Sequence, residues 1–216
     1  MSGIKRILSS LENDLAFKKP TNKIVPLSND NWFSKQIDDL FERPNPNQRE
    51  ESRGVFYASR LGNSCDRYLY LHYNGLLKPV KFPPQLQRIF DNGHSAEDRY
   101  KRYFERMRIL VDCEVPARID NPPIHGRADF ILALPQQDIR RAILELKTIN
   151  DYQFGALTKP KDDHFIQIQV YLNILDISIG IVLYENKDSQ QMKSFLINKD
   201  EKMWGNIVTR CEKIQN

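Results

Sequence analysis

Apolar residues recur with two different periods along this chain, and each change of period marks a predicted boundary between helix and strand. Between Gln85 and Met107 they recur every three or four positions, which predicts one long amphipathic helix. From Ile109 to Ile119 and from Ile124 to Leu134 the pattern becomes strand-like, and a proline pair separates the two runs. The middle of the chain is therefore expected to fold as a helix followed by two strands.

The second half of the chain continues with strands and helices. A third apolar run predicts a strand that pairs with the second one as an antiparallel hairpin, because a short polar turn joins them. Apolar residues nearly encircle the next helix, which indicates burial, and Asp162 or Asp163 is expected to cap its start. The expected elements are a strand over Ile143–Thr148, a helix over His164–Asp176, paired strands over Ser178–Glu185 and Gln191–Asn198, and a closing helix over Asp200–Ile214. Together they predict an α/β (α+β) fold in which a central mixed β-sheet is flanked by helices.

The first fifty residues differ in pattern from the rest. Two helical stripes, over residues 4–15 and 32–41, precede a polar linker with two prolines at residues 43–51. We therefore predict a helical N-terminal extension and linker over residues 1–50, and a second domain over residues 51–216. The N-terminal helices could cover the core, cap a groove or bind a protein partner, and the pattern leaves these uses open.

Composition narrows the class of protein. Of 216 residues, 40% are hydrophobic and 28% charged, which is typical of a globular protein. The net charge of +4 allows a nucleic-acid partner but excludes a uniformly basic surface, so such binding needs a local groove. The three cysteines form no C-x-x-C pair, which favours a reduced, cytoplasmic setting. No apolar run reaches the roughly 18 residues that span a bilayer, so we expect no membrane association.

An acid and a base lie two residues apart in the third predicted strand. Side chains alternate between the faces of a strand, so Glu145 and Lys147 share one face while Leu144 and Leu146 pack on the other. A surface ion pair on an edge strand is one interpretation, and a catalytic pair is the other. The choice depends on whether other polar groups are directed at the same place.

Two further acids meet that condition. Asp129 enters an apolar strand, either as a strand-end cap or as a ligand, and the predicted hairpin brings it next to Glu145. Glu97 lies on the apolar stripe of the helix, where an ionised carboxylate costs several kcal/mol unless it is paired or binds a cation. Gly93, one turn earlier, leaves room for a backbone or a ligand. His94 is one position off the stripe, and a lone histidine there is more often a surface or capped residue than a ligand.

Two other segments have weaker signals. Arg60 and Arg67 lie among tyrosines in the segment Ala58–Tyr73, a combination suited to a phosphate backbone and stacked bases, although a core helix with a basic solvated face fits it too. Gln167 and Tyr171 are one turn apart on the predicted buried helix and share a face, which by itself is compatible with plain packing.

The order of these motifs resembles the PD-(D/E)xK nuclease superfamily, and within it the RecB-type and phage exonuclease branch. The resemblance covers about residues 58–198 and includes the segment from Ser59 to Tyr70. The matching motifs are G-x-x-x-E on a helix (Gly93 to Glu97), G-x-x-D on a strand (Gly126 to Asp129), E-x-K on the next strand (Glu145 to Lys147), and Q-x-x-x-Y on a helix (Gln167 to Tyr171).

The resemblance implies a restriction-endonuclease-like core and assigns roles to these residues. Asp129, Glu145 and the Leu146 carbonyl would ligate a divalent metal together with Glu97, and oxygen ligands favour one or two Mg²⁺ or Mn²⁺ ions. Lys147 would position and help to activate a water. Gln167 and Tyr171 would steady the surrounding elements and the bound strand, with Arg60 and Arg67 also on the substrate.

The chain departs from the branch in two respects. RecB-type enzymes often have histidine where this chain has Glu97, as in the lambda-exonuclease-like relatives, and this leaves the number of metal ions and a minor role for His94 open. Some relatives hold an iron-sulphur cluster through one early and several late cysteines. Here only Cys65 and Cys211 lie near such positions, so we predict no cluster and a packed Cys65 thiol.

The sequence thus predicts a metal-dependent deoxyribonuclease that acts on DNA ends or single strands, in phage DNA metabolism, recombination or repair. A structure-specific or restriction-like endonuclease is the first alternative. The second is a non-catalytic protein that keeps the fold and binds DNA or a protein partner.

Overall fold

Strand β3 (Pro123–Leu134) organises a mixed sheet of six strands in this computed structural model, which describes residues 32–42, 53–78 and 80–215. One edge of β3 pairs antiparallel with β2 (Leu110–Asp120) along most of its length. Its other edge is shared by two strands: β1 (Phe56–Tyr57) pairs in parallel with its start, and β4 (Ile139–Ile149) pairs antiparallel with its end. The predicted hairpin of the second and third strands is therefore confirmed.

The sheet continues from β4 through two more strands. β5 (Ile179–Asn186) runs parallel to β4, and β6 (Met192–Asn198) returns antiparallel to β5. Parallel and antiparallel pairs occur in one sheet, as the fold class predicted from sequence requires. The two-residue strand β1 was not predicted, because two residues are too few to show a period.

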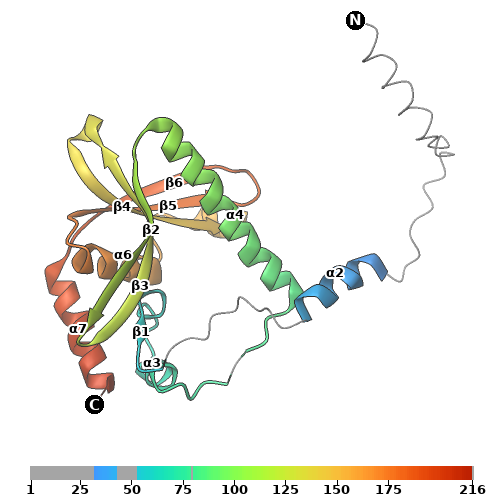
Figure 1. The fold of residues 1–216 in the computed structure, drawn as a ribbon, viewed down its shortest axis with the longest axis horizontal. Helices are drawn as coiled ribbons and strands as arrows, with labels where there is room; N and C mark the ends of the chain where they lie inside the picture. Colours follow the sequence, from blue (N-terminus) through green and yellow to red (C-terminus); the bar gives the residue numbers. More distant parts are fainter. Residues whose placement is uncertain (1–31, 43–52, 79, 216) are drawn as a thin grey trace, which may run out of the picture. The chain divides into compact units, whose positions relative to one another are not determined.

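Helices cover both faces of the sheet (Figure 1). One face packs against α6 (Asp162–Ile174) and α7 (Glu201–Gln215), and this cluster includes Ile143, Ile168 and Ile207. The opposite face packs against α4 (Pro84–Met107) through a second cluster that includes Tyr100, Leu144 and Leu146. The two clusters follow the alternation of side chains along β4, because odd and even residues of the strand face different helices.

Helix α4 forms as predicted, but its apolar stripe is buried only in the middle. Tyr100 and Phe104 are buried, whereas Phe90 and Met107, near the two ends of the stripe, are 41% and 62% exposed. The prediction that all positions of the stripe face the core is therefore wrong at the ends. Only the buried residues Ala96, Tyr100 and Phe104 join the cluster on the sheet, so the remainder of the stripe has no core to pack against.

Shorter elements complete the domain. A 3-10 turn, η1 (Ala58–Arg60), leads into α3 (Asp66–Tyr73), and α5 (Asp151–Ala156) follows β4. The prediction of a packed Cys65 is wrong: this thiol is exposed, because Cys65 is the cap residue before α3 and the helix buries Leu69 instead. The predicted cap of α6 is also wrong, because Lys161 occupies the cap position and both aspartates lie in the first turn, where their charge suits the helix dipole.

The chain divides into two units, Met1–Pro44 and Asn45–Asn216. In the first unit the predicted second helix is present as α2 (Trp32–Glu42). The predicted helix over residues 4–15 and the predicted linker lie outside the described residues. The boundary near residue 50 remains a prediction. Among the helices of the described ranges, none is long and apolar enough to cross a membrane.

Candidate active site

Asp129 and Glu145 meet where strands β3 and β4 separate, a place called the fork below. The ladder between these strands ends at the pair Phe130–Leu144, and the next step would place Asp129 opposite Glu145. There the backbone N–H of Leu146 donates a hydrogen bond to the side chain of Asp129, at Oδ2 and 2.9 Å, and not to the backbone of β3. Asp129 thus replaces a ladder acceptor at the fork, and the Leu146 peptide group lies beside it.

Glu145 is the most enclosed acid of the site, with 1% of its surface exposed. Its Oε1 accepts hydrogen bonds from Lys147 Nζ at 2.7 Å and from Gln167 Nε2 at 2.7 Å. Its Oε2 is buried and has no hydrogen-bond partner among the described residues. Leu144 and Leu146 pack on the opposite face, as the alternation predicted. Glu145 is therefore buried and the Lys147 side chain is 23% exposed, so the two do not form a surface ion pair.

The pKa values of both carboxyl groups at the fork, Asp129 and Glu145, are raised. Burial raises the pKa of Asp129 well above its ordinary value, and the nearby charges of Glu145 and Glu97 raise it further. Burial likewise raises the pKa of Glu145, against the opposing effect of Lys147. For Lys147, burial works to lower the pKa, but the adjacent carboxylates raise it above the usual value and keep the amine charged.

The unpartnered oxygen indicates what this arrangement can bind. A buried carboxylate oxygen without a donor is costly unless a proton or a cation satisfies it. Asp129 and Glu145 supply carboxylate oxygens at one place, and hard oxygen ligands suit Mg²⁺ or Mn²⁺. These two residues therefore fit a divalent cation.

Helix α6 supports the site through Gln167 and Tyr171, the predicted Q-x-x-x-Y pair. Gln167 Nε2 bonds both Glu145 and the hydroxyl of Tyr171, the latter at 3.0 Å. Burial and then the charge of Glu145 raise the pKa of Tyr171. Gly126 of the G-x-x-D motif fits beneath this ring, since a Cβ there would lie 2.5 Å from Tyr171 Cε1. Both helix side chains are buried and hold Glu145 in place, and a direct contact of either with substrate remains a prediction.

The structure brings Glu97 only partly into this group. Its side chain is half-buried on α4, and its charge contributes to the raised pKa of both Asp129 and Glu145. Within residues 32–42, 53–78 and 80–215, however, no three His, Cys, Asp or Glu side chains are arranged to hold a metal ion. Helix α4 packs on the sheet face opposite to Glu145, and one oxygen of Glu145 is taken by Lys147. The role of Glu97 as a third ligand therefore remains a prediction, as does that of the Leu146 carbonyl.

The remaining predicted residues lie outside the fork. His94 is exposed on α4, and Arg67 is exposed on α3. Arg60 donates to the hydroxyl of Tyr68 at 2.6 Å and lines a polar pocket of about 450 Å³. The pocket is formed by Ser59, Arg60, Gly62, Asn63, Ser64, Tyr68 and Asp163, and the last of these belongs to α6. Part of the predicted N-terminal motif thus forms a polar hollow next to the start of the helix that supports Glu145.

Two polar clusters around the site were not predicted from the sequence. Buried Glu185 on β5 accepts from Tyr100 at 2.8 Å and pairs with Arg99, which fastens α4 to the sheet one turn after Glu97. His164 on α6 contacts the hydroxyl of Tyr184 on β5 at 2.8 Å. A signal for His164 was present, because it precedes Gln167 by three residues and therefore shares its face of the helix.

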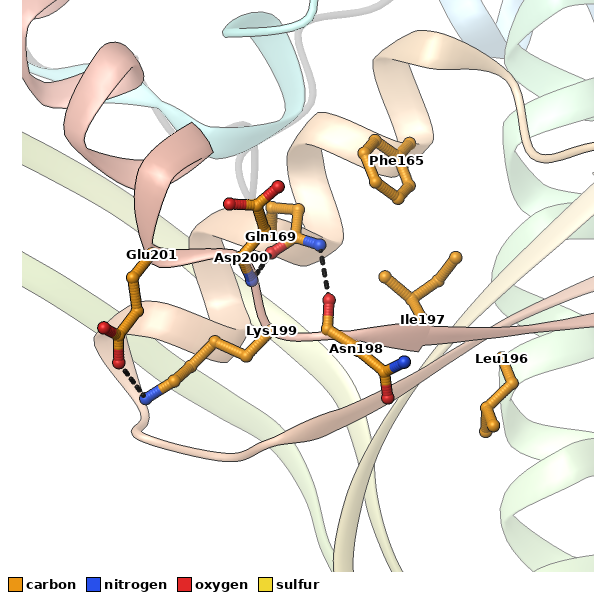
Figure 2. A pocket seen from close by; sticks show the side chains of 8 residues that line it. All are labelled: Phe165, Gln169, Leu196, Ile197, Asn198, Lys199, Asp200 and Glu201. Carbon is orange, nitrogen blue, oxygen red and sulfur yellow. Dashed lines mark hydrogen bonds and ion pairs between the residues drawn. The ribbon is translucent and has the colours of Figure 1, made fainter.

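A larger pocket, of about 540 Å³, contains none of the predicted site residues (Figure 2). It lies between α6, the end of β6 and the start of α7. Figure 2 shows the amide of Gln169 bridging two backbone groups, with its Nε2 donating to the Asn198 carbonyl and its Oε1 accepting from the N–H of Asp200. Gln169 is fully buried, so this bridge fixes the turn between β6 and α7.

Solved structures with a similar fold include an exonuclease. The crystal structure of SSO0001 superimposes with a TM-score of 0.54 at 19% identity, over 84% of this chain and 81% of that one. An alkaline exonuclease (LHK-Exo) from Laribacter hongkongensis gives a TM-score of 0.53 at 17% identity, over 74% of this chain and 86% of that one. The same enzyme in complex with dAMP gives 0.54 at 16% identity and the same coverage. No protein-family model and no curated protein matches the sequence.

At these identities the likeness concerns the fold. The predicted α/β sheet flanked by helices is confirmed, and the fold is like that of the exonuclease structures, as the resemblance in the sequence predicted.

Proposed function

We propose that this protein is a metal-dependent deoxyribonuclease that hydrolyses phosphodiester bonds at DNA ends or in single strands. The observation that carries the proposal is the buried, unpartnered Oε2 of Glu145, a residue next to Asp129 at the fork and two residues before the charged Lys147. Lys147 and Gln167 both bond Oε1 of Glu145, so Oε2 remains available to a cation. The nuclease fold of the solved structures supports the same conclusion.

Each residue at the fork would have a distinct role in this reaction. Asp129 and Glu145 would hold the divalent cation, with Glu97 contributing charge from α4. The cation, when bound, would polarise the scissile phosphate and acidify the attacking water. Lys147 would orient that water and offset negative charge that develops on the phosphate. Gln167 keeps Glu145 in a single orientation through its 2.7 Å hydrogen bond.

DNA is the proposed substrate because a phosphate backbone would match the basic groups on η1 and α3, outside the fork. Arg60 lines the polar pocket near the start of α6, and Arg67 is exposed on α3, the helix that follows. Contacts with phosphate account for much of protein affinity for DNA and are distributed over several side chains. Substitution of one carboxylate at the fork should therefore remove cleavage and leave DNA binding largely intact.

A time course on end-labelled single- and double-stranded DNA with Mg²⁺ or Mn²⁺ tests the proposal. Glu145→Ala is the inactive control, and Glu145→Gln is the matched variant that keeps the size of the side chain. Progressive shortening from an end supports an exonuclease, and efficient cutting of closed circles would replace it with an endonuclease. Binding without any cleavage, with either ion, would show that the fold serves a non-catalytic role.

A further inference from the structure

A histidine and a tyrosine form a polar pair beside Lys147. Tyr184 is the register partner of Lys147 on the adjacent parallel strand, so the two side chains lie on the same face of the sheet. Tyr184 is fully buried, and its hydroxyl accepts from the backbone N–H of Lys161 at 3.0 Å. The other contact of this hydroxyl is Nδ1 of His164, at 2.8 Å. His164 is therefore fixed at the edge of the site.

The position of His164 follows from the helix that supports Glu145. His164, Gln167 and Tyr171 are three and four residues apart, so all three lie along the face of α6 that meets β4 and β5. Gln167 reaches Glu145, and one turn earlier His164 lies within the electrostatic reach of Lys147. The helix thus brings one polar side chain into hydrogen-bond contact with Glu145 and another within electrostatic reach of Lys147.

The hydrogen bonds also indicate which ring nitrogen carries the proton. The Tyr184 oxygen already accepts from a backbone N–H, so its own hydrogen is available for Nδ1 of His164. Burial, and then the charge of Lys147, lower the pKa of His164 to about 4, against the opposing effect of Asp163 and with a further lowering by Lys161. The imidazole is therefore neutral at pH 7, with its hydrogen on Nε2.

The His164 side chain is partly open to solvent. His164 Nε2 lies 3.8 Å from Asp163 Oδ1, which is too long for a hydrogen bond, and 17% of the His164 side chain is exposed. Asp163 lines the polar pocket of Arg60, and Gly62 packs so closely on the Asp163 backbone that a Cβ would clash. His164 therefore directly follows a residue of that pocket in the chain and lies within electrostatic reach of the Lys147 ammonium.

We propose that His164 contacts the substrate, with its Nε2–H donating a hydrogen bond to a non-bridging phosphate oxygen of a nucleotide next to the scissile bond. This contact rests on the nuclease function proposed above and deepens it. A neutral donor holds a phosphate without adding a second cation beside Lys147, whose charge is needed at the reacting phosphate. Tyr184 is a positioning residue in this arrangement, because it acts only by fixing the ring.

Two variants separate the nitrogens of the ring. His164→Asn retains a polar group near the position of Nδ1 and has none at Nε2, whereas His164→Gln extends an amide to the position of Nε2. Each variant is assayed with Mn²⁺ on a labelled oligonucleotide and on a series with one methylphosphonate at each non-scissile phosphate in turn. A methylphosphonate replaces one non-bridging oxygen by a methyl group and so removes the acceptor.

We expect His164→Asn to lower kcat/KM by about 2- to 10-fold, mainly through KM, which is the value of one neutral hydrogen bond. His164→Gln should recover part of this loss. At one phosphate near the scissile bond the methylphosphonate should slow the wild-type and Gln proteins and leave the Asn protein unaffected. Such non-additivity reports a direct contact, and a merely structural role would not produce it.

Thermal unfolding confirms that each variant is folded, and His164→Ala replaces His164→Asn if the latter is not. A wild-type protein that never cleaves unmodified DNA overturns the nuclease function and this contact with it. Wild-type cleavage with additive losses at every phosphate overturns the contact alone, as does an unchanged kcat/KM in the folded His164→Asn protein.

Discussion

Replacing Asp129 with Asn should stabilise the protein without metal and abolish cleavage. The carboxylate of Asp129 is crowded by Glu145 and Glu97, and its hydrogen bond from Leu146 N needs only one oxygen. An Asn keeps that acceptor and removes the charge. We expect a gain of about 1–2 kcal/mol, the order of an unsatisfied buried polar group. For a domain of this size the gain corresponds to a rise in Tm of roughly 2–8 °C.

The gain must depend on pH in one direction. The pKa of Asp129 is raised in the folded state, so the folded protein binds this proton more tightly than the unfolded chain does. Stability from the protonated group is complete below the ordinary aspartate pKa of about 4 and is lost as pH rises through the folded pKa. The Tm difference between the Asp129→Asn variant and the wild-type protein should therefore be small near pH 4 and largest at neutral pH.

Differential scanning calorimetry in chelator from pH 4 to 8, repeated with Mg²⁺ or Mn²⁺, measures both effects. Added cation should raise the Tm of the wild-type protein by mass action and leave that of Asp129→Asn unchanged. A lower Tm for Asp129→Asn at pH 7, or a difference that does not change with pH, would refute the electrostatic reasoning. Cleavage at the native rate by Asp129→Asn would refute the site itself.

Two further substitutions test the supports of the site. Gly126→Ala should destabilise the fold by about 1–3 kcal/mol, measured by urea unfolding, because its Cβ would lie 2.5 Å from the Tyr171 ring. Gly155→Ala is the matched control, with open space around its Cβ, and should be neutral or slightly stabilising; equal losses in both would contradict the packing argument. Glu185→Gln should cost about 1–3 kcal/mol and lower kcat, because Tyr100 and Arg99 lose their charged partner on the sheet; unchanged unfolding would show that this cluster does not fasten α4.

Local periodicity was sufficient to predict most of the fold. The long helix, the hairpin of β3 and β4 and the buried helix α6 each follow from side-chain spacing within one segment. The meeting of Asp129 with Glu145 was predictable for the same reason, because strand alternation and a short turn determine which residues share a face. Predictions of burial failed where the sheet is too short to cover the whole helix. Phe90 and Met107 are exposed because their turns of α4 lie outside the buried cluster.

The supports of the site could not be predicted, because they join residues distant in sequence. The contact of His164 with Tyr184 depends on where α6 crosses β5, and the contact of Gly126 with Tyr171 depends on how closely α6 approaches β3. Neither distance is encoded in a local pattern. A histidine three residues before the glutamine of Q-x-x-x-Y was visible in the sequence, but the pattern provided no reason to choose it over a solvent-facing position.

The register between β3 and β4 determines whether Asp129 and Glu145 share one face of the sheet, so correct strand pairing during folding also assembles the site. A slip of one residue between the strands would reverse the faces of one of them, so that either Asp129 or Glu145 would face the aromatic cluster under α4 and its apolar neighbour would face α6. That arrangement would bury a carboxylate among Tyr100, Phe104 and their neighbours, at a cost of several kcal/mol, which is a large part of the stability of a typical domain. The shifted pairing is thus less stable than the native one, and a correctly folded molecule has both acids on the face that α6 supports.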